Sequence, residues 1–149
     1  MAYARRMVGL PPKSEQKGGL VIRSCLIASL VLVALATAAH AQDAAAGEKD
    51  FAVCRACHQI GPGAKIAVGP VLNGVVGRKA GTFAGYTYSP ANKDSGIVWT
   101  AEELDKYLTN PQAVVPHTKM IFPGLKDAQK RQNVIAYLAQ FNEDGTKKN

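Results

Sequence analysis

The pentapeptide Cys54-Arg55-Ala56-Cys57-His58 decides how the rest of the chain is interpreted. Two cysteines separated by two residues and followed at once by a histidine form the spacing that is typical of covalent haem attachment. The chemistry explains this spacing, because each thiol can add to one vinyl group on the same edge of a porphyrin. The histidine is then held beneath the iron as an axial ligand. The motif therefore predicts a c-type haem attached through Cys54 and Cys57, with His58 on the iron.

The same residue types also occur in a redox-active dithiol, in a disulfide and in half of a zinc site. A thioredoxin-like dithiol lies between a strand and a helix of a βαβ unit, and no such pattern surrounds this motif. A zinc site needs four ligands, whereas the chain after residue 41 offers only the two cysteines, His58 and His117. The context of the motif therefore favours haem.

The first 41 residues have the pattern of a secretory signal peptide. Basic residues precede an uncharged, mostly aliphatic run at 24–39, which ends in the small-x-small cleavage pattern Ala39-His40-Ala41. We expect cleavage after Ala41, a mature domain of residues 42–149, and a periplasmic location. The alternative is a leader kept as a membrane anchor, but the uncharged run falls short of the roughly 20 residues that span a bilayer. Cys25 lies in this leader, and translation could also begin at Met7.

Most of the basic character of the chain comes from the leader. The formal net charge of the whole chain is +7, and five of its 18 basic residues and one of its 11 acidic residues precede residue 42. The remainder has a net charge of +3, so nucleic-acid binding loses its main support. A mature chain of this size is small for burying a core by itself, and a tethered apolar macrocycle would supply part of that core.

The hydrophobic pattern predicts an all-α domain whose first and last helices cross. Residues 43–53 are predicted as the first helix, with Asp43 as its N-cap, and residues 127–141 as the last, with an apolar stripe at helical spacing. Gly47 shares a face with Phe51, and a glycine within a helix usually marks the close approach of another backbone. We therefore expect the helices to cross at Gly47. A flexible residue near a helix start is the alternative.

The chain between these two helices is predicted to be mostly irregular. Glycines and prolines interrupt residues 59–85 too often for long regular elements, which is reasonable where a segment wraps around a prosthetic group. A short helical turn is expected at 89–95. Thr100, with a glutamate three residues later, has the spacing of a capping box and opens a helix that Asn110-Pro111 ends. Residues 111–123 are expected to be irregular again, and no strand of useful length is predicted.

The residue on the other side of the iron decides between an electron carrier and an enzyme. After residue 41 the sequence holds one methionine, Met120, in an apolar, loop-like segment beyond the middle helix. A thioether opposite His58 raises the reduction potential and favours reversible one-electron transfer. A lone methionine can equally fill a gap in a core. His117 is a rival ligand, with a solvated loop histidine as its other role.

Together these features resemble the class I c-type cytochromes, most closely mitochondrial cytochrome c and the short bacterial cytochromes c2. The similarity covers residues 47–141. It rests on Gly47, Phe51, the haem-attachment motif, Gly69-Pro70, Gly77-Arg78-Lys79, Tyr86-Thr87-Tyr88, Ala91-Asn92-Lys93, Gly96-Ile97-Val98-Trp99, Pro116-His117-Thr118-Lys119-Met120-Ile121-Phe122 and Leu138.

The resemblance implies the cytochrome c fold, with loops wrapped around a single covalently bound haem c. It also implies that His58 and Met120 are the two axial ligands of the iron. The Pro70 carbonyl would accept a hydrogen bond from His58, a contact that sets the orientation of the ring and its basicity. Phe122 would close the haem pocket on the methionine side.

The resemblance further implies partners for the polar edge of the haem. Arg78, Tyr88 and Trp99 would satisfy the buried propionates, since a guanidinium offers a fork of N–H groups and each ring offers one donor. Taken alone, Trp99 could be plain core packing and Arg78 a surface charge. Asn92 and Thr118 would hold a water molecule near the methionine.

The function implied is that of a soluble, monomeric, periplasmic one-electron carrier without catalytic residues and without stable membrane insertion. Its partners would be a donor of the cytochrome bc1 type and an oxidase or photosynthetic reaction centre as acceptor. Short, charge-guided encounters suit a carrier. Exposed lysines could form a basic rim for docking, with Lys119 and Lys126 best placed, although scattered lysines are by default a solvated surface. The rim consists of Lys65, Lys79, Lys93, Lys119, Lys126 and Lys130.

Four positions depart from the pattern of the mitochondrial relatives, which generally carry lysine there. In this chain they are Val53, Gln112, Ala113 and Asp127. The positive face is therefore expected to be weaker or displaced, which leaves the identity of the partner open.

Two other functions stay open on sequence alone. One is a haem enzyme of the peroxidase type, in which Met120 leaves the iron and peroxide takes its place. The near-infrared thioether-to-iron band of the oxidised protein distinguishes it, being present in a carrier and absent in the enzyme. The other is a membrane-tethered cytochrome that keeps its leader, which N-terminal sequencing of the purified protein would reveal.

Overall fold

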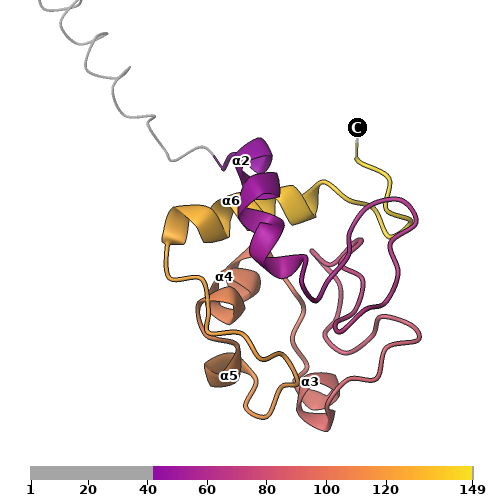
Figure 1. Ribbon diagram of the computed structural model, residues 1–149. Helices are drawn as coiled ribbons and strands as arrows, with labels where there is room; N and C mark the ends of the chain where they lie inside the picture. Colours follow the sequence, from indigo (N-terminus) through magenta and orange to yellow (C-terminus); the bar gives the residue numbers. More distant parts are fainter. Residues whose placement is uncertain (1–41, 149) are drawn as a thin grey trace, which may run out of the picture. The chain divides into compact units, whose positions relative to one another are not determined.

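The structure is a computed structural model that describes residues 42–148, so that the predicted leader lies outside the described residues (Figure 1). The elements in this range are α2 (Ala44–Asp50), a 3-10 helix (Phe51–Cys54), α3 (Pro90–Asp94), α4 (Ala101–Thr109), α5 (Pro111–Val114) and α6 (Ala128–Ala139). Strand-like pairing within residues 42–148 is limited to two isolated antiparallel bridges, Lys79 with Val98 and Phe141 with Lys147. The prediction of an all-α fold is confirmed.

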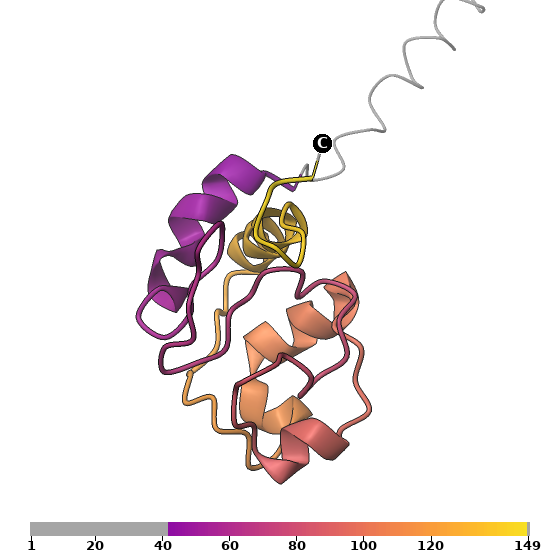
Figure 2. The same ribbon diagram turned by 90° about the vertical axis from the view of Figure 1, so that its right-hand side faces the viewer.

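Helices α2 and α6 cross at Gly47 (Figures 1 and 2). The Asp43 side chain caps α2 by accepting hydrogen bonds from the amides of Ala45, at 2.8 Å, and Ala46, at 3.1 Å. A Cβ atom on Gly47 would overlap the Asn133 carbonyl of α6 and lie 2.9 Å from the Cβ of Tyr137. The predicted crossing is therefore confirmed, because only a residue without a side chain allows this approach.

The core lies between α6, the 3-10 helix and α4. Phe51, Val134 and Ile135 are almost fully buried, and the ring centroids of Phe51 and Tyr137 are 5.4 Å apart. The last helix begins one residue later than predicted, at Ala128, and ends two residues earlier, at Ala139 with Gln140 as its C-cap. Phe141 instead pairs with Lys147 in an isolated bridge, which takes it out of the helix.

Helix α4 begins as the capping signal predicts, because the Thr100 hydroxyl accepts a hydrogen bond from the Glu103 amide at 3.2 Å. The expectation of an irregular segment at 111–123 is wrong for its first turn, which forms α5. The Asn110 side chain caps α5 through the Ala113 amide at 3.3 Å, and a proline at the first helical position is pre-set for a helix. The Asn-Pro pair that ends α4 thus also starts α5.

Residues 59–89 contain no helix and fold back beside the helices as loops (Figure 1). The second half of this segment is tied to the chain before α4, where the Trp99 amide donates to the Arg78 carbonyl at 2.9 Å and the Ala80 amide to the Ile97 carbonyl at 2.8 Å. Every helix within residues 42–148 is too short or too polar to traverse a lipid bilayer. The loops and the helices enclose a cavity between them.

Candidate cofactor site

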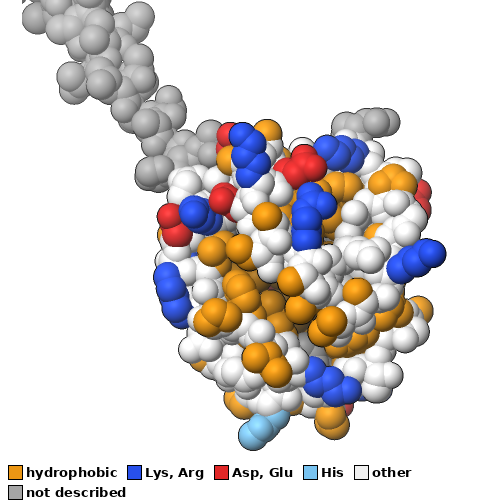
Figure 3. Space-filling view, viewed as in Figure 1, with side chains coloured by type: hydrophobic (Ala, Val, Ile, Leu, Met, Phe, Trp, Pro, Cys, Tyr) orange, Lys and Arg blue, Asp and Glu red, His pale blue; other side chains and the backbone are white. Residues whose placement is uncertain are grey.

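A largely apolar cavity of about 380 Å³ lies between the irregular segment and the helices. Hydrophobic side chains gather around a hollow on the face that Figure 3 shows. All eleven residues that the sequence analysis assigns to the site line this cavity. They are Cys54, Cys57, His58, Pro70, Arg78, Tyr88, Asn92, Trp99, Thr118, Met120 and Phe122.

The attachment motif is wound as a helical turn at the end of the 3-10 helix. The amides of Cys57 and His58 both donate to the Cys54 carbonyl, at 3.1 and 2.9 Å, and both thiols are free. Burial, with a smaller contribution from the Cys57 thiolate charge, raises the pKa of the Cys54 thiol to about 11. A redox-active dithiol needs a lowered thiol pKa, so this environment disfavours that alternative.

The imidazole of His58 is held against the Gly69-Pro70 turn. Its Nδ1 atom lies 2.8 Å from the Pro70 carbonyl oxygen, which can only accept, so Nδ1 carries the proton and Nε2 keeps a free lone pair. A Cβ atom on Gly69 would lie 2.7 Å from Nδ1, so glycine is needed for this contact. Burial lowers the pKa of His58, and the hydrogen bond to Pro70 offsets this only in part. The ring is therefore kept as the neutral form that binds metals.

The segment that carries Met120 is positioned from α4. The hydroxyls of Tyr107 and Thr118 are joined at 2.9 Å, and the Thr118 hydroxyl accepts a hydrogen bond from the Met120 amide at 3.3 Å. Tyr107 also lines the cavity, and burial raises the pKa of its phenol. No sequence signal marks Tyr107 as a site residue, because a tyrosine on the apolar face of a helix has the signature of ordinary core packing.

One residue that lines the cavity, Asn92, has an unsatisfied polar atom. The Asn92 side-chain oxygen is buried and has no hydrogen-bond partner among the residues that the structure describes. Buried acceptors in native proteins are almost always paired. The cavity therefore needs a donor here, such as an ordered water molecule that accompanies a bound group.

Arg78 supplies a half-buried positive charge at another wall of the cavity. Its guanidinium donates to the Asn73 carbonyl at 2.8 Å and to the Val71 carbonyl at 3.2 Å. None of the ion pairs within residues 42–148 involves it. Burial lowers the pKa of Arg78 and raises that of Tyr88, so the phenol remains a donor. This corner suits an anionic group such as a carboxylate.

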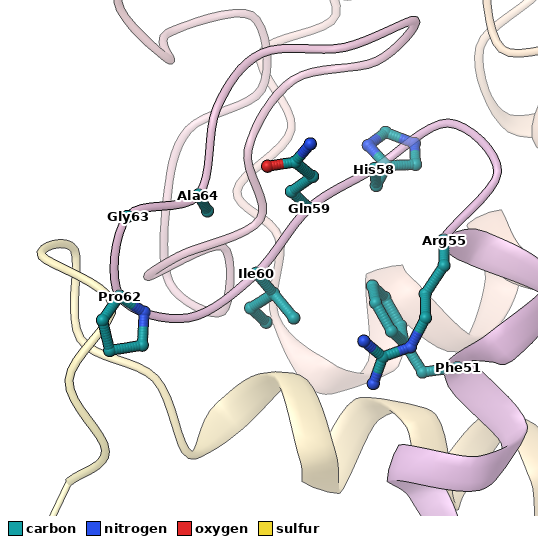
Figure 4. Close-up of a pocket in the computed structure, with 8 residues that line it drawn as sticks. All are labelled: Phe51, Arg55, His58, Gln59, Ile60, Pro62, Gly63 and Ala64. Atoms are coloured by element: carbon teal, nitrogen blue, oxygen red, sulfur yellow. The ribbon is translucent and has the colours of Figure 1, made fainter.

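A second hollow, of about 280 Å³, lies behind the motif and shares His58 with the main cavity (Figure 4). Its charged side chain, Arg55, lies over the Phe51 ring at 5.5 Å and pairs with Glu48 at 3.7 Å. Because that charge is already neutralised and no other predicted site residue lies there, we assign this hollow no function.

The mouth of the main cavity is apolar. Val53, Val68 and Ile121 line the cavity and are 57%, 72% and 97% exposed. All six predicted rim lysines are exposed. Lys119 donates to the Thr87 carbonyl at 2.8 Å and Lys126 to the Thr109 carbonyl at 2.9 Å.

With the exception of Val53, two groups of predicted residues lie away from the cavity. His117, the rival ligand, is exposed and does not line it. The positions with departures from the mitochondrial pattern are all exposed, and of these only Val53 lies at the mouth.

Comparisons with known proteins agree with this geometry. The family profile described as Cytochrome c matches residues 44–142. The chain is 54% identical over 127 residues to cytochrome c2 of Blastochloris viridis, which covers 85% of this chain and 100% of the relative. It is 55% identical to cytochrome c2 of Rhodoblastus acidophilus, which covers 72% of this chain and 100% of the relative. The solved structure of cytochrome c2 from Rhodospirillum centenum is 42% identical to this chain, with a TM-score of 0.64. The match covers 67% of this chain and 98% of the chain in that structure.

This family implies one covalently bound haem c, and the residues present fit such a group. Two free thiols and a neutral imidazole line one apolar cavity together with a thioether. The same cavity is lined by Arg78, whose guanidinium has no ion-pair partner within residues 42–148, and by Asn92, whose amide oxygen has no hydrogen-bond partner there. The chain belongs to the cytochrome c family, as a class I c-type cytochrome close to bacterial cytochrome c2.

Proposed function

We propose that this protein is a soluble periplasmic carrier of single electrons between membrane complexes of a respiratory or photosynthetic chain. The observation that carries the proposal is that His58, fixed by Pro70, and Met120 line one apolar cavity together with both cysteines. The haem that Cys54 and Cys57 would attach supplies the one-electron couple. His58 and Met120 would be its two axial ligands, a pair that raises the reduction potential.

The protein residues around the site favour a fixed arrangement in both oxidation states. Pro70 orients the imidazole, and the Tyr107 and Thr118 hydroxyls hold the backbone of Met120. Such supporting contacts keep ligands in place and tune them. Arg78, Tyr88 and Trp99 would pair with the propionates, Asn92 and Thr118 would hold a water molecule, and Phe122 would close the pocket.

We propose no catalytic residue in this chain. An enzyme of the peroxidase type needs an open position at the iron, and in this proposal the Met120 thioether fills it. Thr118 is hydrogen-bonded to Tyr107, to Gln112 and to the Met120 amide, and these three bonds support a loop that stays closed.

The partners proposed are redox proteins that dock at the mouth of the cavity, a cytochrome bc1-type donor and an oxidase or reaction-centre acceptor. The apolar mouth and Lys119, which lines the cavity, support this role, because an apolar patch with charge beside it suits a short-lived encounter. The exposed Lys126 would extend the basic rim. We further propose that residues 1–41 are a signal peptide cleaved after Ala41, which places the domain of residues 42–149 in the periplasm as a monomer.

Replacing the sulfur ligand tests the proposal directly. In Met120→Ala, the oxidised haem protein should lose the near-infrared thioether-to-iron band, and its reduction potential should fall by about 0.2 V or more, within the roughly 0.8 V range that axial ligands span. Absorption spectroscopy and redox titration measure both quantities.

Ile121→Ala is the matched control, because the neighbouring side chain is almost fully exposed, and it should change neither quantity. If Met120→Ala kept the band and the potential of the parent, Met120 would not be a ligand and the proposed carrier would lack its closed coordination.

A further inference from the structure

The loop that carries Met120 is fastened to α4 at both ends. At its near end the Thr118 hydroxyl is bound to Tyr107 at 2.9 Å. At its far end the Leu125 amide donates to the Leu108 carbonyl at 2.8 Å. Between these points, the amides of Ile121 and Phe122 donate no backbone hydrogen bond within residues 42–148. Apart from the bond of the exposed Lys119 to the Thr87 carbonyl, the hydrogen bonds that position the thioether segment are therefore those at its two fastened ends.

Arg131 of α6 is the centre of the far fastening. Its Nε atom donates to Asp105 Oδ1 of α4 at 2.8 Å. Its Nη1 atom donates to the carbonyls of Leu125 at 2.8 Å and Lys126 at 3.0 Å. The side chain is only 8% exposed. One guanidinium thus joins α6, α4 and the end of the loop.

Arg131 contributes more to holding the loop end in place than to holding α4 and α6 together. Helices α4 and α6 also meet through buried apolar residues, among them Leu104, Leu108 and Val134. Besides Arg131, the loop end is held by one backbone hydrogen bond, the Lys126 contact to Thr109 and the packing of the partly buried Leu125 against the core. Charge-assisted hydrogen bonds are about twice as strong as neutral ones, so loss of Arg131 weakens the loop more than the helical core.

We propose that Arg131 is a positioning residue for Met120. Held by Asp105, it fixes the far end of the loop and so sets how readily an outside ligand displaces the thioether. This inference rests on the proposed function, in which Met120 ligates the haem iron.

The test compares variants of the complete haem-loaded protein. Arg131→Gln removes the fork and the charge, and Lys130→Gln removes one charge from the adjacent, exposed position of the same helix. The oxidised proteins are titrated with imidazole, which must displace Met120 to bind, and loss of the near-infrared band reports the displacement. Imidazole should bind Arg131→Gln about tenfold more tightly than the parent, since charge-assisted bonds to two carbonyls are lost. Lys130→Gln should match the parent.

A denaturant titration followed by helical circular dichroism separates positioning from general stability. Band loss in Arg131→Gln should precede helix unfolding by a wider margin than in the parent. If both transitions move together and imidazole affinity is unchanged, Arg131 only stabilises the fold. If Lys130→Gln gained as much imidazole affinity as Arg131→Gln, the effect would come from the change in net charge alone. Either result overturns the inference.

Two further variants keep the test decisive if Arg131→Gln does not fold. Arg131→Lys keeps the charge but not the fork, and Asp105→Asn removes the carboxylate that holds the fork in place. Both should bind imidazole more tightly than the parent, by a smaller factor than Arg131→Gln, and parent-like affinity in both would overturn the inference. Absence of the band in the parent would instead overturn Met120 ligation and with it the proposed function.

Discussion

His117 is the one residue other than glycine with a positive φ among residues 42–148, at 64°. The left-handed conformation costs an L-residue roughly 1–2 kcal/mol. The cost is lowest for residues such as asparagine, aspartate and histidine and highest for β-branched residues. This bend precedes Thr118 directly, so it turns the chain at the point where the Thr118 hydroxyl meets Tyr107. The conformation of one exposed residue thus helps to direct the Met120 segment.

We expect His117→Val to lower the free energy of unfolding by about 1 kcal/mol, because a β-branched residue resists positive φ. His117→Gly should be at least as stable as the parent, since glycine adopts this conformation freely. Guanidinium unfolding of the haem-loaded proteins measures both. Equal destabilisation by valine and glycine would show that the histidine side chain, and not the backbone bend, matters at this position.

The sequence predicted the site residues that belong to short motifs. The Cys-x-x-Cys-His spacing specified the thiols and the imidazole by itself, and the family resemblance added Pro70, which the structure brings to 2.8 Å from His58. Tyr107 and Arg131 have no such signal. Their partners lie 11 and 26 residues away, and only the packing of α4 against the loop and α6 brings these pairs together.

At the scale of elements, capping residues indicated where helices begin more accurately than the apolar stripe indicated where the last helix ends. The predicted caps Asp43 and Thr100 both accept the expected amide hydrogen bonds, whereas Asp127, predicted as the first residue of the last helix, is its N-cap. The sequence did not indicate α5, because an Asn-Pro pair signals the end of one helix and the start of another equally well. Phe141 continued the apolar stripe of α6, yet a bridge to Lys147 removes it from the helix.

The crossing of α2 and α6 gives a prediction about Gly47. In an isolated helix, alanine is favoured over glycine by about 1 kcal/mol. Here a methyl group would overlap the Asn133 carbonyl, and overpacking of this kind costs about 1–3 kcal/mol. Gly47→Ala should therefore destabilise the protein by about 1–3 kcal/mol despite its better helix propensity, as measured by chemical unfolding.

Ala45→Gly serves as the comparison, because this residue of α2 is exposed and only helix propensity should act there. It should cost about 1 kcal/mol. If Gly47→Ala instead raised the stability, the two helices would not be in contact at this position.

At the scale of the whole molecule, the cavity is assembled from segments far apart in the chain. The attachment motif comes from the end of the 3-10 helix, one wall from the loop at 68–78, the opposite side from 118–122, and the back from α4 and α6. A domain of this size buries little core alone. The same apolar group that performs the proposed chemistry would thus complete the interior, which explains why loops without regular structure can form so much of the fold.

The mouth of this cavity is apolar. At four positions where mitochondrial relatives generally carry lysine, this chain has other residues, namely Val53, Gln112, Ala113 and Asp127. Binding to a redox partner should therefore depend on apolar contact as well as on charge.

Ile121 is the clearest test, because it is 97% exposed at the mouth and its replacement removes no core packing. Burial of an isoleucine contributes roughly 1.5–3 kcal/mol, so Ile121→Ser should raise the Kd for a purified cytochrome bc1 complex by about tenfold or more. The reduction potential and the salt dependence of the association rate should stay unchanged, because no charge is altered. Val98→Ser provides the control, since Val98 is 45% exposed and lies outside the cavity. Equal effects of the two serine variants on Kd, measured by stopped-flow reduction at several salt concentrations, would place the docking surface elsewhere on the molecule.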